Sequence, residues 1–275
     1  MTAEVSALSI VFMALSGAVG IALPIVLFLY LRRKKKADVL PFFAGCGVML
    51  LFALILESIV HQLVLGKSPF GEKILNNNWA YALYGGLMAG LFEETGRFIA
   101  FKTVLKKYRG RDINALMYGA GHGGFEAVVM LTGGMISNIV LAIMLNAHTT
   151  GVLTQDLTGE QLEQAEAIFE TLRTTPPVEY LVGIVERVFA VVLQISLSVF
   201  VWFAAKDRER VWLFPVSVLL HAAIDGVAVI LLREGTNVWA IEGVIAAFTA
   251  AAAAFAWKLY KNAQKSFKED PEITE

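Results

Sequence analysis

Long apolar blocks alternate with short polar breaks along the whole chain. Each block has about 20 or more residues, the length that an α-helix needs to cross the hydrocarbon core of a bilayer. We therefore expect an all-α, polytopic bundle of transmembrane helices. The blocks are Ala7–Leu31, Val39–Leu65, Trp79–Leu105, Ile113–Asn146, Val178–Ala205, Val211–Leu232 and Val238–Tyr260.

The composition strengthens this prediction. Of the 275 residues, 57% are hydrophobic and 17% are charged, whereas soluble domains average about 45–50% and about 25%. No polar stretch is long enough to bury a core of its own, which excludes a soluble catalytic domain. The formal charge of −1 gives no reason to expect nucleic-acid binding. A single cysteine, Cys46, excludes an internal disulfide.

Basic residues set the expected orientation, because Lys and Arg favour cytoplasmic loops. The loops 66–78 and 148–177 have few of them and are expected outside. Seven crossings satisfy the pattern, with the N-terminus outside and the C-terminus in the cytoplasm, as suits a bacterial plasma membrane. Splitting 113–146 at Gly133–Gly134 gives the alternative of eight spans. The basic clusters expected inside are 32–36, 106–111, 206–210 and 258–268.

We expect one transmembrane domain over residues 1–260, with a motif-bearing core at 79–232 and a charged cytoplasmic tail at 261–275. The external segment 148–177 contains a helix signal, since Thr158 and the residue three places later, Gln161, have capping-box spacing. The apolar residues that follow, up to Leu172, recur at helical spacing. We interpret this amphipathic segment as a structural lid or spacer at the membrane surface.

Ionisable residues inside three of the blocks are the main functional signal, because each costs about 2.5–3.5 kcal/mol on insertion scales. In each block, two of them lie one helical turn apart and so share a helix face. They are Glu93, Glu94 and Arg97 in the third block, His122 and Glu126 in the fourth, and His221 and Asp225 in the sixth.

These residues are expected at one depth in the membrane. Glu94 lies twelve residues before Lys106, and His122 and His221 each lie eleven residues after the last basic residue before their span. At 1.5 Å rise per residue, each is roughly 16–18 Å from the cytoplasmic anchors. Small residues nearby allow close helix approach, so we expect one polar cluster. These glycines are Gly86, Gly90, Gly119, Gly121, Gly123 and Gly124.

Spacing alone leaves several functions open for such a cluster. Two imidazoles with nearby carboxylates can hold Zn²⁺ or another divalent metal. Alternatively, a glutamate activates water without a metal, while His and Asp stabilise the oxyanion. Either version hydrolyses an amide or ester, whereas the remaining alternatives are structural clamps between helices and a transport or proton-relay pathway. The candidate metal ligands are His122, Glu126, His221 and Asp225.

Three motifs, taken in their order along the chain, resemble a known family, the membrane peptidases of the YhfC type. The motifs are Glu93-Glu94-x-x-Arg97, His122-x-x-x-Glu126 and His221-x-x-x-Asp225, and FEETGRF and GHGGFEA are the most specific segments. This type is grouped with CAAX prenyl endopeptidases, bacteriocin-processing enzymes and PrsW-type intramembrane proteases. The Aph scaffold subunit of gamma-secretase is related to the same group. The resemblance covers about residues 79–232.

The resemblance implies an intramembrane endopeptidase that cleaves a membrane-embedded or membrane-proximal peptide. It implies that the Glu93/Glu94 pair includes the water-activating base, that His122 assists it, and that His221 with Asp225 completes the site. The two supporting residues are Arg97, which we expect to hold Glu93 ionised, and Glu126.

The sequence departs from the prenyl endopeptidase pattern in ways that change the expected metal site and substrate. Two residues rather than three separate the Glu pair from Arg97, Glu126 takes the place of a histidine, and Asp225 that of a common asparagine. The additional carboxylates favour a metal site and give no support for prenylated substrates. The scaffold relative keeps open a catalytically silent scaffold or binding subunit, in a membrane complex or a homo-oligomer. A transporter often has two related halves, and the Glu-Glu motif is not repeated.

Glu57 and His61 also lie four residues apart in the second block. They follow the basic cluster 32–36 by about twenty residues, so the same depth count places them near the outer surface. We therefore expect an interfacial pair away from the polar cluster.

Overall fold

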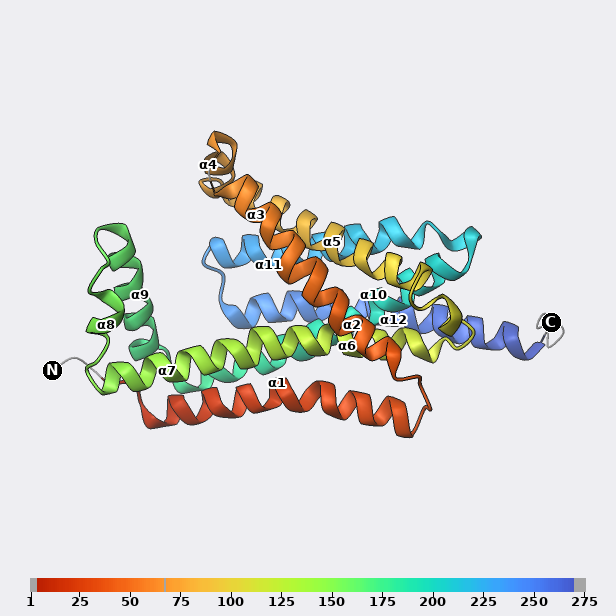
Figure 1. Ribbon diagram of the computed structural model, residues 1–275, viewed down its shortest axis with the longest axis horizontal. Coiled ribbons are helices and arrows are strands. Elements are labelled where there is room, and N and C mark those ends of the chain that lie inside the picture. The colour runs from red at the N-terminus through yellow and green to blue at the C-terminus, as the bar shows by residue number, and fades with distance from the viewer. Residues whose placement is uncertain (1–3, 67, 270–275) are drawn as a thin grey trace. The chain divides into compact units, whose positions relative to one another are not determined.

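The computed structural model describes residues 4–66 and 68–269, and every regular element in these ranges is helical (Figure 1). Among the described residues, six helical runs are long and apolar enough to cross a membrane. The all-α, multi-pass class expected from the sequence is therefore confirmed. The six runs are Ala7–Arg33, Leu40–Leu65, Ile113–Asn146, Pro177–Lys206, Arg208–Arg233 and Val238–Gln264.

The third predicted span, α5 (Asn78–Lys102), is 25 residues long but is not one of these six. Its hydropathy is lowered by the charges near its middle, Glu93, Glu94 and Arg97. Seven spans and the orientation of the termini therefore stay predictions. The helical run through Gly133–Gly134 is continuous, so the turn that the eight-span alternative requires is not seen there.

The chain forms two compact units, and the first comprises residues 4–23 and 127–187 of the described chain. Its helices are held by side-chain bonds to backbone: Ser16 Oγ donates to the carbonyl oxygen of Tyr180 at 2.7 Å, and Thr132 Oγ1 to that of Gly17 at 2.7 Å. The elements are the first part of α1 (Ala7–Arg33), η3 (Val128–Gly133), α7 (Gly134–Asn146), α8 (Gly151–Thr154), α9 (Glu160–Thr174), η4 (Pro177–Leu181) and the start of α10 (Val182–Lys206).

The predicted amphipathic helix in the segment 148–177 is present as α9. Phe169 and Leu172 on its predicted apolar face are buried, whereas Ile168 is exposed. The expected cap at Thr158 is wrong, because the N-cap position is Gly159. That residue has a φ of 56°, a left-handed conformation that glycine adopts without a steric penalty.

The second unit comprises residues 24–126 and 188–269 of the described chain and contains every predicted site residue. Its elements are the end of α1, α2 (Leu40–Val48), η1 (Met49–Glu57), α3 (Ser58–Leu65), α4 (Pro69–Leu75), α5, η2 (Lys106–Tyr108), α6 (Ile113–Ala127), most of α10, η5 (Arg208–Arg210), α11 (Leu213–Arg233) and α12 (Val238–Glu269). A single domain over 1–260 stays a prediction. Of the predicted tail, residues 270–275 lie outside the described residues, and the rest continues α12.

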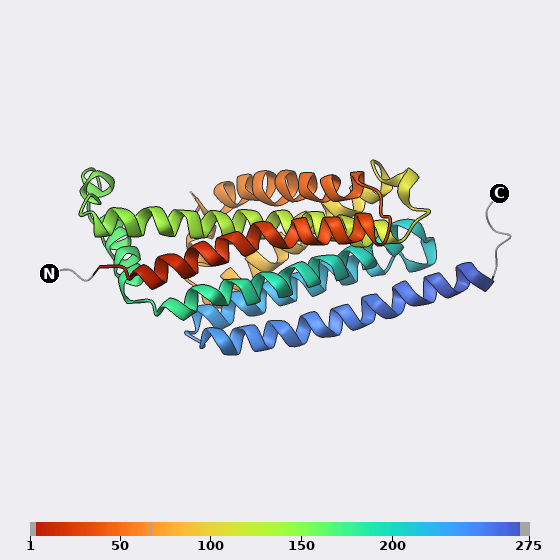
Figure 2. The same cartoon turned by 90° about the horizontal axis from the view of Figure 1, so that it is seen from below.

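Helix α10 forms the centre of this unit. Consecutive residues from Val199 to Ala205 are buried, together with Leu193 and Leu197. They pack against α5, α6, α11 and α12, which surround them in the largest apolar cluster among the described residues. Figure 2 shows α11 and α12 running side by side. A rigid central helix surrounded by four others fixes the positions of side chains that point between them.

Glycines bring the site-bearing helices close together, as the sequence indicates. On α5, a Cβ at Gly86 would lie closer than 3.0 Å to the carbonyl oxygen of Ala222 on α11, and a Cβ at Gly90 would lie 2.6 Å from that of Val218. Direct backbone contact of this kind explains why α5 and α11 run side by side in Figure 1. Because the two backbones are in contact here, side chains one turn further along α5 reach those of α11.

The two ends of the second unit differ in charge. At one end the loops before α2, before α6 and after α10 meet: Arg111 Nη1 lies 3.3 Å from the carboxylate of Asp38, and Lys206 Nζ lies 2.8 Å from Asp112 Oδ1. These loops carry the three basic clusters at 32–36, 106–111 and 206–210. At the other end, α4 and the start of α5 meet the end of α11, where Arg233 Nη1 donates to the carbonyl oxygen of Leu75 at 3.1 Å.

We predict that Gly86→Ala destabilises the protein by about 1–3 kcal/mol, because the new methyl group forces α5 and α11 apart. Thermal unfolding of the detergent-purified protein measures this. The matched control is Gly85→Ala, one residue earlier, where an added Cβ meets nothing within 4 Å. There the substitution should be neutral or stabilising, by about 0.5–1 kcal/mol, since alanine favours the helix. Equal effects at the two positions would contradict the close approach.

Candidate functional site

Arg97 and Glu94 form an ion pair that is completely buried. Arg97 Nη1 donates to both carboxylate oxygens of Glu94, each at 2.7 Å, and neither side chain is exposed. Arg97 Nη2 donates to the side-chain oxygen of Gln194 on α10. The expectation that Arg97 pairs with Glu93 is therefore wrong. Both glutamates lie within one turn of Arg97, but the Glu93 carboxylate binds partners on other helices instead.

His221 on α11 is oriented by this ion pair. Its Nδ1 lies 2.8 Å from Glu94 Oε1. An ionised carboxylate can only accept, so Nδ1 is the donor and carries a proton. This leaves Nε2 directed at two further carboxylates: Asp225 Oδ2 at 3.4 Å and Glu93 Oε2 at 3.9 Å. The ring is thus held in one orientation and, if neutral, in one tautomer.

Glu93 is the point where four helices meet. Its Oε2 lies 2.8 Å from His122 Nε2 on α6 and accepts a hydrogen bond from Gln194 Nε2 on α10 at 2.9 Å. His221 of α11 approaches the same oxygen. One carboxylate oxygen of α5 is therefore surrounded by two imidazoles and an amide, each from a different helix.

His122 and Glu126 share a helix face, and each contacts a different residue of the cluster. His122 is completely buried, is stacked on Tyr118 with ring centroids 6.0 Å apart, and pairs with Glu93. Its Nδ1 is buried and has no hydrogen-bond partner in the described part of the chain. Glu126 Oε2 instead accepts a bond from Gln194 Nε2 at 3.1 Å. Glu126 therefore reaches the cluster through Gln194.

Gln194 is the residue that sequence reasoning missed. It is buried and contacts Arg97, Glu93 and Glu126, so it connects α10 to both α5 and α6. A search for ionisable residues passes over an amide because it has no charge. The available signal is that Gln194 is the only amide or charged residue between Arg187 and Lys206. A polar side chain in such an apolar run must find partners inside the bundle.

Glu57 lies closer to the cluster than expected. It is buried and within electrostatic range of Glu93, His221 and Asp225. The expectation of an interfacial position is wrong for Glu57, because its side chain is buried. The nine residues of η1, which end at Glu57, are π-helical, whereas the count from the sequence assumed an α-helix. A π-helix advances less per residue than an α-helix, so a count at 1.5 Å per residue overestimates the depth of Glu57. π-Helical turns occur frequently at functional sites.

The side chains of the cluster differ in exposure. The side chains of Glu94, Arg97 and His122 are completely buried, and those of His221 and Glu93 nearly so, whereas that of Asp225 is 39% exposed. Of these six side chains, only that of Asp225 is substantially exposed, on the α11 side of the cluster.

The chemistry of the donors fits a metal such as Zn²⁺. Two imidazoles and a carboxylate form a common catalytic zinc set, and the cluster contains the imidazoles of His122 and His221 with two carboxylates, Glu93 and Asp225, next to them. His221 is arranged as metal-binding histidines usually are, because a carboxylate on Nδ1 leaves Nε2 for a metal. Within residues 4–66 and 68–269, however, no three His, Cys, Asp or Glu residues already have the arrangement of a metal site. The side chains are hydrogen-bonded to one another instead.

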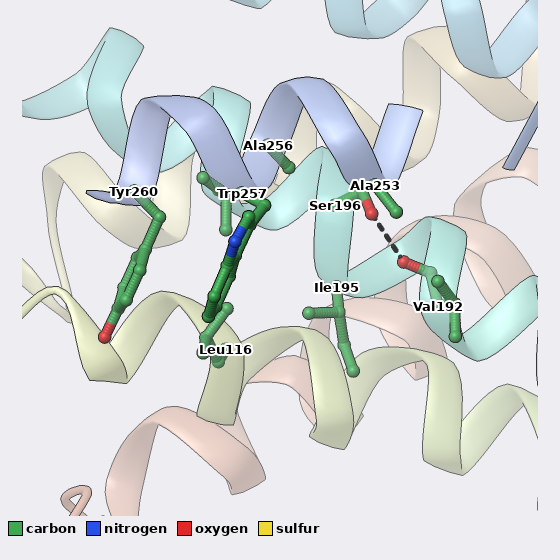
Figure 3. A pocket seen from close by; sticks show the side chains of 9 residues that line it. Leu116, Val192, Ile195, Ser196, Ala253, Ala256, Trp257 and Tyr260 are labelled. Carbon is green, nitrogen blue, oxygen red and sulfur yellow. Dashed lines mark hydrogen bonds between the residues drawn. The ribbon is translucent and has the colours of Figure 1, made fainter. Parts of the chain in front are cut away.

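An apolar groove of about 240 Å³ lies elsewhere in the second unit (Figure 3). It is formed between α6, α10 and α12, with Trp257 and Tyr260 on one wall and Leu116 and Ile195 below them in that view. None of the residues of the polar cluster lines it. We therefore assign it no part in the site.

We predict that Arg97→Met destabilises the protein by about 3–5 kcal/mol, because it leaves the buried Glu94 carboxylate without its cation. Adding Glu94→Gln to Arg97→Met should recover part of this loss, since the amide removes the unpaired charge. Thermal unfolding in detergent measures both changes. The control is Lys102→Met on the same helix, an exposed position where we expect a change within about 0.5 kcal/mol. A loss as small for Arg97→Met as for this control would contradict the buried pair.

Comparisons with known proteins identify the family of this chain. A family model described as "YhfC intramembrane metalloprotease" matches residues 19–245. The "Uncharacterized membrane protein YhfC" of Bacillus subtilis (strain 168) is 37% identical over 248 residues, which cover 90% of this chain and 94% of that relative. No solved structure matches the chain. The chain belongs to the YhfC intramembrane metalloprotease family.

Proposed function

We propose that this protein is an intramembrane metalloendopeptidase that hydrolyses a peptide bond at the centre formed by Glu93, His122 and His221. The observation that carries the proposal is the position of the Glu93 carboxylate between two imidazoles from two other helices. Ionisable side chains buried among apolar helices are costly. Six such groups, brought together from the three helices α5, α6 and α11, are more than a structural clamp requires.

Glu93 is the proposed general base. It accepts a proton from the attacking water and passes that proton to the amine that leaves, a role that needs a carboxylate within reach of the water. Gln194 holds this carboxylate by donating to the same oxygen that faces His122. The amide thereby fixes the direction from which Glu93 acts.

His122 and His221, with Asp225 beside them, are the proposed metal ligands. When bound, a divalent metal at such a centre polarises the substrate carbonyl and makes its bound water more acidic. Glu94 and Arg97 are positioning residues, because they set the ring of His221 through Nδ1. Such partners of a ligand typically contribute about 10–100-fold in metal affinity or activity.

The proposed substrate is a peptide segment inside or next to the bilayer, because the site lies within apolar helices and is accessible at Asp225. A bacterial plasma membrane is the proposed location, with the basic loops of the second unit on the cytoplasmic side.

We predict near-stoichiometric zinc in the wild-type protein purified in detergent, and its loss in the variant His122→Ala/His221→Ala. Both imidazoles are needed because neither helix alone supplies a zinc set. Elemental analysis of the purified protein measures the metal. The matched control is His148→Ala, an exposed histidine outside the cluster, which should keep its zinc. Wild-type protein without metal after gentle purification would refute the metal part of the proposal.

We predict that Glu93→Gln lowers the cleavage rate by roughly 10²–10⁴-fold, the usual contribution of a general base, while zinc stays bound. The assay uses liposomes with the protein and single-span bacterial membrane proteins, and mass spectrometry detects new peptide termini. Glu72→Gln, an exposed glutamate, is the control and should cleave like wild type. Loss of zinc in Glu93→Gln would make Glu93 a ligand rather than the base. Absence of new termini with the wild-type protein would favour a silent scaffold.

A further inference from the structure

A second row of polar side chains runs between α5 and the helix formed by η1 and α3. Glu57 Oε1 lies 3.1 Å from His61 Nε2, and His61 Nδ1 lies 3.0 Å from the Tyr84 hydroxyl on α5. At its inner end, Glu57 is within electrostatic range of Glu93, His221 and Asp225. At its outer end, the row points to the end of the unit that carries α4, since α3 leads into α4 and α4 into α5.

We propose that Glu57, His61 and Tyr84 line the route by which water, the second substrate of hydrolysis, reaches the buried site from the α4 end of the second unit. This inference rests on the proposed function, because hydrolysis is the reason that water is needed. The contacts and exposures that support the route do not depend on it. Each bond cleaved consumes one water molecule, and the bilayer core supplies none. The innermost site groups are completely buried, so water needs a polar path to Glu93.

Exposure along the row supports a route. The side chain of Glu57 is 11% exposed and that of His61 is 33% exposed, and Tyr84 is half-buried. Accessibility is thus higher at His61 and Tyr84 than at Glu57. In a purely structural clamp, the polar groups would be satisfied inside the bundle, and we would expect the His61 ring to be buried rather than partly exposed.

The neighbouring positions on the same helices are apolar. Ile59, between Glu57 and His61, is 49% exposed, and Leu83, next to Tyr84, is 65% exposed. Exposed apolar side chains on spanning helices face lipid, whereas polar ones face the bundle interior or a water-filled space. The polar row and the apolar positions therefore lie at the same depth but are expected to contact different solvents.

Cysteine labelling tests this difference without any cleavage assay. Cys46, the only cysteine in the sequence, is first replaced by alanine. Single cysteines are then introduced by Glu57→Cys, His61→Cys and Tyr84→Cys, with Ile59→Cys and Leu83→Cys as controls of matched depth. The protein in liposomes is treated on both faces with the membrane-impermeant reagent 2-(trimethylammonium)ethyl methanethiosulfonate. This reagent reacts with the thiolate, which forms in water but not in lipid.

We expect the cysteines at 61 and 84 to react at least ten-fold faster than those at 59 and 83, and the cysteine at 57 to react faster than that at 59. Equal rates within each pair, or faster labelling of the controls, would overturn the route. Lack of reaction at 57, 61 and 84 together would overturn it as well. The Tyr84/Leu83 pair keeps the test valid if Glu57→Cys does not fold. Because labelling needs no catalysis, a failure of the proposed peptidase activity would be seen separately.

Discussion

The buried ion pair of Arg97 and Glu94 is the interaction on which the rest of the site depends. A charge inside an apolar bundle is tolerated only when a partner of opposite sign compensates it in good geometry. Here one guanidinium bonds both oxygens of Glu94 and also the amide of Gln194. Glu94 in turn orients His221, and Gln194 orients Glu93. Glu93 and His221, the two side chains proposed to act on the substrate, are therefore held in place through one cation, Arg97.

Backbone packing makes this network possible. Glycines on α5 let its backbone contact that of α11 directly, so short polar side chains can bridge the two helices. On α6, an added Cβ at Gly121 would run into the backbone of Phe42 on α2. His122, the next residue, is thereby held deep in the unit and directed at Glu93. The same helices that exclude lipid from the cluster also keep its members within hydrogen-bond distance.

The sequence predicted the helices and the residues that meet, but not how they pair. Membrane length and hydropathy determine the spans, and a count from the basic loops placed Glu94, His122 and His221 at one depth. Pairing depends on side-chain direction, which a count does not contain: Arg97 could serve either glutamate, and it binds Glu94. Gln194 carries no charge, so a search for ionisable residues passed over it. Glu57 was misplaced because periodicity does not reveal that η1 is π-helical. The roles of these residues in catalysis and metal binding stay predictions.

The amide dipole of Gln194 has one fixed orientation in the cluster. Its oxygen accepts from Arg97, while its nitrogen donates to Glu93 and Glu126. An amide offers an acceptor on one side and donors on the other without carrying a charge. A glutamate here would repel two carboxylates, and a lysine would repel the guanidinium. Position 194 thus lies between the guanidinium of Arg97 and the carboxylates of Glu93 and Glu126, and a neutral side chain there contacts both without repelling either.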